Sequence, residues 1–175
     1  MRSGLPASVR HWIIVNAICV TALINVVVNA GIAWLSVGGR SQIPLWAPPL
    51  LGGPSTTTDT VATLFLLPFI TCVVATAAVR HDLRRGSLQP LQRSALPLLA
   101  RLPAGSVRRG AMLGVMSVAA FAPPAIVVLV AVHADDLSVS DFVIFKTLFA
   151  VVLGLLVTPL IAFAALSDSA ARGPS

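Results

Sequence analysis

The stretch SDFVIFKTLFAVVLGLLVTPLIAFAAL, residues 140–166, decides the fold class of this chain. A helix needs roughly 20 predominantly apolar residues to cross the hydrocarbon core of a membrane. This stretch exceeds that length, and its charged side chains, Asp141 and Lys146, both lie near its beginning. The stretch therefore predicts a membrane-spanning helix over about residues 142–167.

The composition extends this prediction to the whole chain of 175 residues. Hydrophobic residues make up 57% of it, charged residues only 10%, and the mean hydropathy is +0.93, whereas soluble domains are about a quarter charged. The run near the N-terminus is too long for the apolar core of a secretory signal, which indicates a retained span. We expect an all-α integral membrane protein, a bundle of four transmembrane helices in a single domain over residues 11–167. The other three spans are expected at about residues 11–37, 60–79 and 110–132.

The distribution of charge predicts how the spans are oriented. Most basic residues lie between the second and third spans, in a loop over residues 80–109, whereas the loop before the fourth span has Asp135 and Asp136 and no basic residue. Positive charge marks cytoplasmic loops, so this loop, residues 1–10 and a flexible tail over residues 168–175 are expected in the cytoplasm. The chain is then a multi-pass protein of a bacterial-type inner (plasma) membrane, with both termini inside.

The arginines of the central loop also indicate partners. A net charge of +6 in a soluble chain would suggest nucleic acid, but these arginines flank membrane spans. Attraction to the anionic head groups of a lipid bilayer is the better interpretation, and we expect no nucleic acid partner. The expected head-group contacts are Arg80, Arg84, Arg85, Arg93, Arg101, Arg108 and Arg109.

Two loops have patterns of their own. In the central loop, apolar residues recur at helical spacing over residues 91–102, which is compatible either with a short helix on the membrane surface or with an irregular proline-rich connector. The loop over residues 40–58 is apolar and rich in proline and glycine. We expect it to cap the outer end of the bundle; the alternative is a re-entrant segment.

Polar residues follow regular stripes along the spans. Thr21, Asn25 and Asn29 recur every four residues in the first span, and the fourth span repeats this spacing with Lys146 and Thr158 around Ala150 and Gly154. Residues four apart share a helix face, and small residues in membrane helices mark close approach of another helix. These stripes, together with Asp59 and Thr63 of the second span, are candidates for a polar path or for a helix interface.

Asp59 and Lys146 raise a question of pairing. The simplest role for Asp59 is a helix N-cap, and the simplest for Lys146 is to extend toward the outer head groups. Both spans run inward from the same side, so the ammonium would reach the depth of the carboxylate. Because Lys146 shares a face with small residues, we expect it to point into the bundle, with Asp59 as its partner and Asn29 nearby.

Prolines interrupt three of the predicted helices. A proline inside a helix removes a backbone donor and frees the carbonyl four residues earlier, which bends the helix. The expected kinks are at Pro68, Pro123, Pro124 and Pro159.

The motifs that mark enzymes are missing from the sequence: there is no HExxH, CxxC, G-x-S-x-G or phosphate-binding loop. We therefore expect no catalysis, cofactor or metal. Two functions stay open. In the first, the stripes line a path for a small solute or ion through an oligomer, as in a transporter or channel. In the second, they hold helices together in a non-catalytic subunit or scaffold that packs against a partner membrane protein.

Overall fold

The computed structural model describes residues 11, 13–47, 55–88, 102–103, 105–132 and 136–170, with residues 13, 16–18 and 168–170 described by backbone alone. The described chain is helical, apart from two short strands. Three of its helices are long and apolar enough to cross a membrane. In chain order the elements are η1 (Ile13–Val20), α2 (Thr21–Ser36), β1 (Gln42–Pro44), α3 (Thr56–Arg84), α4 (Ser106–Ala131), β2 (Asp136–Ser138) and α5 (Val139–Ala170).

The first predicted span is helical but not uniformly α-helical. Eight residues near its beginning, η1, form a π-helix, which passes after Val20 directly into the 16 residues of α2. α2 alone is shorter than a membrane-spanning helix, and the two elements together have the length expected of the first span. Nothing in the apolar sequence of η1 marks it as π-helical. Such segments are rare and occur disproportionately at functional sites.

The other helices begin or end beyond the predicted apolar spans, because the polar residues that flank these spans are also helical. α3 begins at Thr56, where the hydroxyl of Ser55 caps the helix by accepting from the backbone N–H of Thr58 at 3.3 Å. The helix continues to Arg84, and α4 begins at Ser106, so both ends of the predicted central loop are helical. α5 reaches Ala170, inside the predicted tail. The predicted surface helix over residues 91–102, with Arg93 and Arg101, and the two terminal segments 1–10 and 171–175 fall outside the described residues, apart from Leu102.

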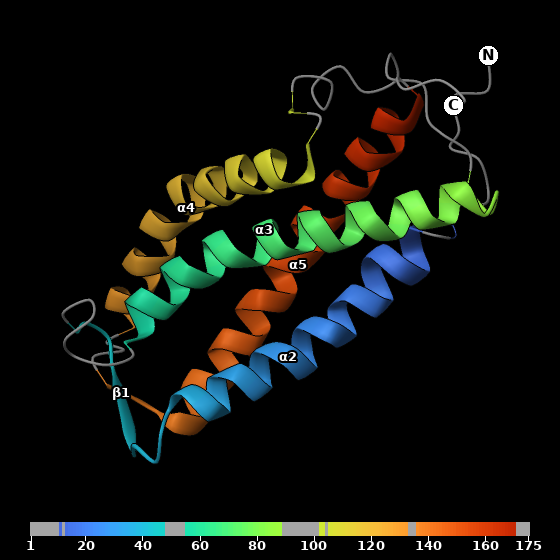
Figure 1. The fold of residues 1–175 in the computed structure, drawn as a ribbon. Helices are drawn as coiled ribbons and strands as arrows, with labels where there is room; N and C mark the ends of the chain where they lie inside the picture. The colour runs from blue at the N-terminus through green and yellow to red at the C-terminus, as the bar shows by residue number, and fades with distance from the viewer. Residues whose placement is uncertain are drawn as a thin grey trace.

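The helices lie in the spatial order α2, α5, α3, α4. α5 packs against both α2 and α3, and α4 packs against the other side of α3 (Figure 1). One end of the bundle carries β1 and β2, and we call it the sheet end. The other end carries Arg80, Arg84, Arg85 and the start of α4, and we call it the arginine end. The start of η1 and the last turn of α5 also lie there.

Buried apolar clusters join the helices along their length. The central one combines Leu64 and Leu67 of α3 with Leu153 and Ile161 of α5, and Ala122 of α4 packs into it. A second cluster at the arginine end brings α3 and α5 together, and a third at the sheet end includes Ala33 and Phe142. α5 contributes residues to all three clusters, and this shared packing makes it the central helix of the bundle.

Close packing of α4 on α3 depends on two glycines. A Cβ atom on Gly114 would lie 2.8 Å from the backbone oxygen of Phe65, and one on Gly110 would lie 3.0 Å from that of Phe69. The GxxxG spacing of these glycines is frequent by chance, yet here it lets two helix backbones approach directly.

The two strands depart from the predicted all-α fold. β1 and β2 pair antiparallel, with Ile43 opposite Leu137, and so join the segments that follow α2 and precede α5. Three-residue strands that lie far apart in the sequence carry no alternating pattern long enough to predict. Ile43 and Leu45 are buried against the sheet end, which agrees with a capping loop over the described residues 40–47.

The four helix-internal prolines lie inside helices that continue past them. Pro68 belongs to α3, Pro123 and Pro124 to α4, and Pro159 to α5. None of them therefore ends its helix. The kinks that we expect at these positions stay a prediction.

Candidate functional site

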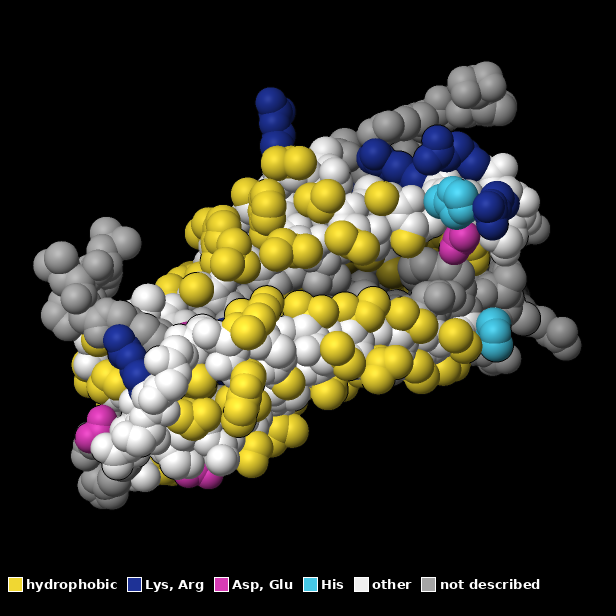
Figure 2. All heavy atoms as spheres, turned by 60° about the horizontal axis from the view of Figure 1, so that its bottom comes forward, with side chains coloured by type: hydrophobic (Ala, Val, Ile, Leu, Met, Phe, Trp, Pro, Cys, Tyr) yellow, Lys and Arg dark blue, Asp and Glu magenta, His cyan; other side chains and the backbone are white. Residues whose placement is uncertain are grey.

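A groove runs between α2 and α3, because each packs on α5 and they make little contact with each other. The volume of the groove is about 460 Å³, within the usual range for small-molecule sites. Figure 2 shows a hollow between two ridges of hydrophobic side chains, with basic side chains gathered at one end. Along α3 the groove extends from Asp59 to Asp82, which is about 35 Å at the rise of an α-helix.

The sides and the floor of this groove differ in chemistry. Ile24 and Val28 of α2, and Ile70 and Val74 of α3, line its sides and are exposed. The groove is therefore open along its length, toward whatever surrounds the helices. Polar side chains lie deeper, since Asn25, Thr63, Lys146 and Thr158 are all buried.

All of the polar residues predicted as path or interface candidates line this groove. They come from three helices that the sequence alone does not place side by side. The set is Thr21, Asn25 and Asn29 of α2, Asp59 and Thr63 of α3, and Lys146 and Thr158 of α5.

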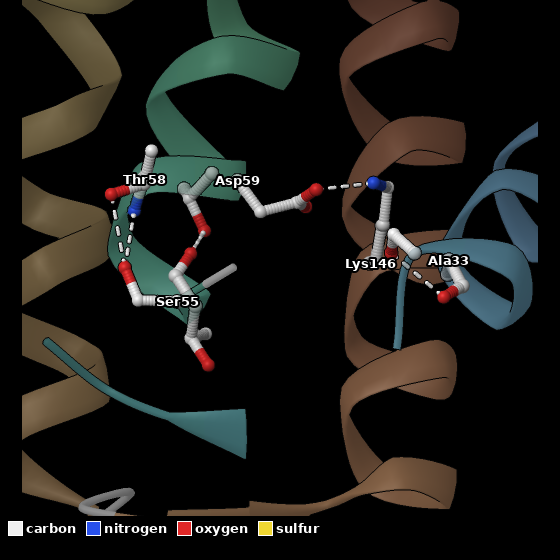
Figure 3. A network of polar contacts seen from close by, with 8 residues as sticks. Ala33, Ser55, Thr58, Asp59 and Lys146 are labelled. Carbon is white, nitrogen blue, oxygen red and sulfur yellow. Dashed lines mark hydrogen bonds and ion pairs between the residues drawn. The ribbon is translucent and has the colours of Figure 1, made fainter. Parts of the chain in front are cut away.

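Lys146 and Asp59 form an ion pair at the sheet end of the groove (Figure 3). The predicted pairing is thereby confirmed in the folded chain. Asp59 is not the helix N-cap, contrary to our first interpretation, because α3 begins earlier than its apolar run and Ser55 takes that role. Asp141 forms its own contact, accepting from the hydroxyl of Ser138 at 2.6 Å.

The surroundings of Lys146 explain why its charge is tolerated. Its side chain points into the bundle, with only 4% of the residue exposed, and its ammonium lies 5.9 Å from the centroid of the Phe142 ring. A buried ammonium without a countercharge would be costly, whereas a carboxylate in contact compensates much of that cost. The alternative, extension into outer head groups, does not describe this conformation.

The asparagines of α2 bind each other and approach α5. Asn29 donates its amide to the backbone oxygen of Asn25 at 3.1 Å and to the side-chain oxygen at 3.2 Å. A Cβ atom on Gly154 would overlap the side-chain nitrogen of Asn25. The small-residue face of α5 thus leaves space for this amide, as the stripes predicted.

Thr158 lies on the floor of the groove near its middle. It stands 12 residues after Lys146, or about 18 Å along α5. The residue is 2% exposed, and its hydroxyl has no hydrogen-bond partner in the described chain. Buried hydroxyls are usually paired, so this one is available to a further group.

Sequence reasoning missed part of the groove on α3. Asp59, Thr63, Leu67, Thr71 and Ala75 line it at intervals of four residues. This spacing is the signal that we used for the first and fourth spans, and it is visible in α3 as well. It was obscured because Leu67 interrupts the polar residues.

The arginines differ in their surroundings. Arg84, Arg85 and Arg108 are exposed, and Arg80 is half-buried, as head-group contacts require. Arg109 is 1% exposed, and its Nε donates to the backbone oxygen of Pro103 at 3.1 Å. Within the folded chain Arg109 therefore fixes the entry to α4 instead of presenting its charge at the surface.

The described residues include no group of three or more histidine, cysteine, aspartate or glutamate side chains that could hold a metal ion. Comparison with known proteins adds no function. The chain matches no known protein family, no curated protein and no solved structure.

Proposed function

We propose that this protein is a small multi-pass protein of a bacterial-type inner membrane, and that it acts as an oligomeric transporter or channel for a small solute or ion. One observation carries the proposal. The seven polar candidates from three separate helices line a single groove that extends for about the thickness of a membrane. Polar side chains at membrane depth are costly and are retained mainly for function or for assembly.

The proposal includes an orientation. The sheet end lies outside, and the arginine end, with both termini, lies in the cytoplasm, because arginines gather there. Arg80, Arg84, Arg85 and Arg108 then contact anionic head groups. The indole rings of Trp34 and Trp46, both exposed near the sheet end, occupy the opposite interface.

An oligomer is part of the proposal because a single chain with four helices leaves little room for an enclosed path. Several copies together would enclose one. The π-helix supports a functional role for the same place, since it ends at Val20, where the lining of the groove begins.

Two measurements test this function. The first is the mass of the protein in mild detergent, where we expect a homo-oligomer. The second is flux into liposomes that contain purified protein, followed with K⁺, Cl⁻ and glycerol as separate probes. Replacement of Asn25 and Asn29 by leucine should reduce the flux while the oligomer persists. Matched leucine substitutions at Val26 and Val27, which are exposed and do not line the groove, should not.

The alternative function is a non-catalytic subunit whose groove receives a helix of a partner membrane protein. The exposed apolar sides of the groove favour it. A monomer that co-purifies with a fixed larger protein and supports no flux would establish this alternative and refute the transporter or channel.

A further inference from the structure

We infer that the groove binds an uncharged, largely apolar molecule with one or two hydrogen-bonding oxygen atoms, which enters sideways from the lipid. This inference rests on the proposed membrane location and narrows the solute of the proposed function to one chemical class. It depends on the charges of the lining, the direction of the opening and the free hydroxyl of Thr158.

The charges of the lining exclude an ion as the preferred occupant. Asp59 and Lys146 neutralise each other at the sheet end, and Asp82 lies about 35 Å away at the arginine end. Between them, the described lining consists of amides, hydroxyls and hydrocarbon. A charged group there would lose its solvation without gaining a countercharge, and that loss is large in a medium of low polarity.

The opening determines how the occupant arrives. Exposed apolar side chains, such as Ile24, Ile70 and Val74, form both sides of the groove. If the helices cross a membrane, these sides face lipid tails, and only a molecule that dissolves in the hydrocarbon reaches the groove by this route. Its apolar body then contacts these side chains.

The floor of the groove has side chains that can form hydrogen bonds with the oxygen atoms of the occupant. The hydroxyl of Thr158 is buried without a partner, and Thr71, about level with it on α3, also lines the groove. A threonine in a helix adopts two χ1 rotamers about 120° apart, and a change from one to the other exchanges the positions of its methyl and hydroxyl groups. The hydroxyl can then donate to a carbonyl or hydroxyl oxygen of the occupant, and the amides of Asn25 and Asn29 lie in the same lining.

The test uses three photoreactive probes with the same long alkyl body and different polar groups: a ketone, a carboxylate and a quaternary ammonium. Liposomes with the full-length protein are labelled, and the modified peptides are identified by mass spectrometry. We expect the ketone to label peptides of α2 and α3 at least about tenfold more than either charged probe, because a penalty of 1.4 kcal/mol already gives tenfold. Equal or stronger labelling by a charged probe overturns the inference.

Matched variants locate the site. Val74→Trp fills the groove and should reduce ketone labelling severalfold, whereas Val73→Trp, at an exposed neighbour outside the lining, should not. Thr158→Val should reduce it roughly two- to tenfold, the value of one hydrogen bond. Thr147→Val is its control, since Thr147 also has an unpaired buried hydroxyl on α5 but lies outside the groove. Ketone labelling that is unchanged in the Val74→Trp variant refutes this site.

Competition identifies the source of the occupant. Unlabelled diacylglycerol and an unlabelled long-chain ketone are added separately, to represent a membrane lipid and a dissolved solute. Competition by either one supports the site, and competition by neither refutes it. Flux without ketone labelling would leave the proposed function intact and reject only this ligand class. Specific labelling of a protein that purifies as a monomer with a fixed larger partner would reject the transporter or channel and leave this ligand class intact.

Discussion

The contact between Lys146 and Asp59 links two helices through the only charged side chains that the described groove holds near the sheet end. Both residues could be predicted to meet because both helices start from the same end of the bundle and the lysine side chain is long. Which residue caps the start of α3, Asp59 or a neighbour, could not be predicted. The first turn of α3 contains several hydroxyls, and only the structure distinguishes the capping Ser55 from its neighbours.

Lys146→Met should destabilise the protein by about 3 kcal/mol, because it leaves the Asp59 carboxylate partly buried without a countercharge. Asp59→Asn in that background should restore at least about 1 kcal/mol. Thermal and denaturant unfolding in mild detergent measure both values. Asp141→Asn, at an exposed carboxylate of the same helix, is the control and should cost about 0.5 kcal/mol. If the two changes are additive, the pair does not form.

Gly154→Ala should weaken the packing of α2 on α5. The added Cβ atom would occupy the position of the Asn25 amide, and such overpacking costs about 1–3 kcal/mol. Asn25→Ser shortens that side chain, so the same alanine should cost less in its presence. Unfolding of the four proteins in detergent gives the coupling. An equal cost in both backgrounds would mean that Asn25 does not lie over Gly154.

At the scale of the helices, the sequence predicts where each helix lies along the chain better than it predicts the residues at which the helix begins and ends. Hydropathy locates the three helices that are long and apolar enough to cross a membrane, and also the helical segment formed by η1 and α2. It does not report the polar ends, such as Thr56–Asp59, which are helical but carry hydroxyls and charge. Nor does it predict η1, because π-helical backbone leaves no periodic signal in a segment of eight mostly apolar residues.

The sequence also does not predict the order of the helices in space. Each stripe predicts a face that contacts another helix, but it does not predict which helix that is. The groove exists because α2 and α3 share α5 as a neighbour, and that arrangement follows from the combined fit of all the faces. The residues of the groove were therefore predictable, and their assembly into one groove was not.

Gly114→Ala should separate α3 from α4, since the new Cβ atom would contact the backbone oxygen of Phe65. Backbone cannot move aside as a side-chain end can, and we expect a loss of about 2 kcal/mol. Gly31→Ala is the matched control. It lies in exposed α2 with nothing within 4 Å of an added Cβ atom, so alanine there should stabilise by about 0.5–1 kcal/mol. Similar effects at both positions in unfolding experiments would contradict close packing of α4 on α3.

For the molecule as a whole, the proposed orientation predicts which surfaces are accessible. Single cysteines at Ser41 and at Arg85, both exposed and at opposite ends, are introduced after the native cysteines are replaced. An impermeant thiol reagent added to intact cells should modify position 41 and reach position 85 only after the membrane is opened. The reverse pattern would invert the orientation and place the arginines outside.

The small sheet affects how the groove can change shape. β1 follows α2 and β2 precedes α5, while the backbone N–H of Thr57 donates to the oxygen of Leu45 at 3.1 Å. All three helices that line the groove are therefore fastened to one another at the sheet end. We therefore expect the groove to widen by rotation of its helices about that end, with the greatest displacement at η1. In the proposed orientation, passage of a solute through the groove would then be controlled at the arginine end, on the cytoplasmic side and farthest from the sheet.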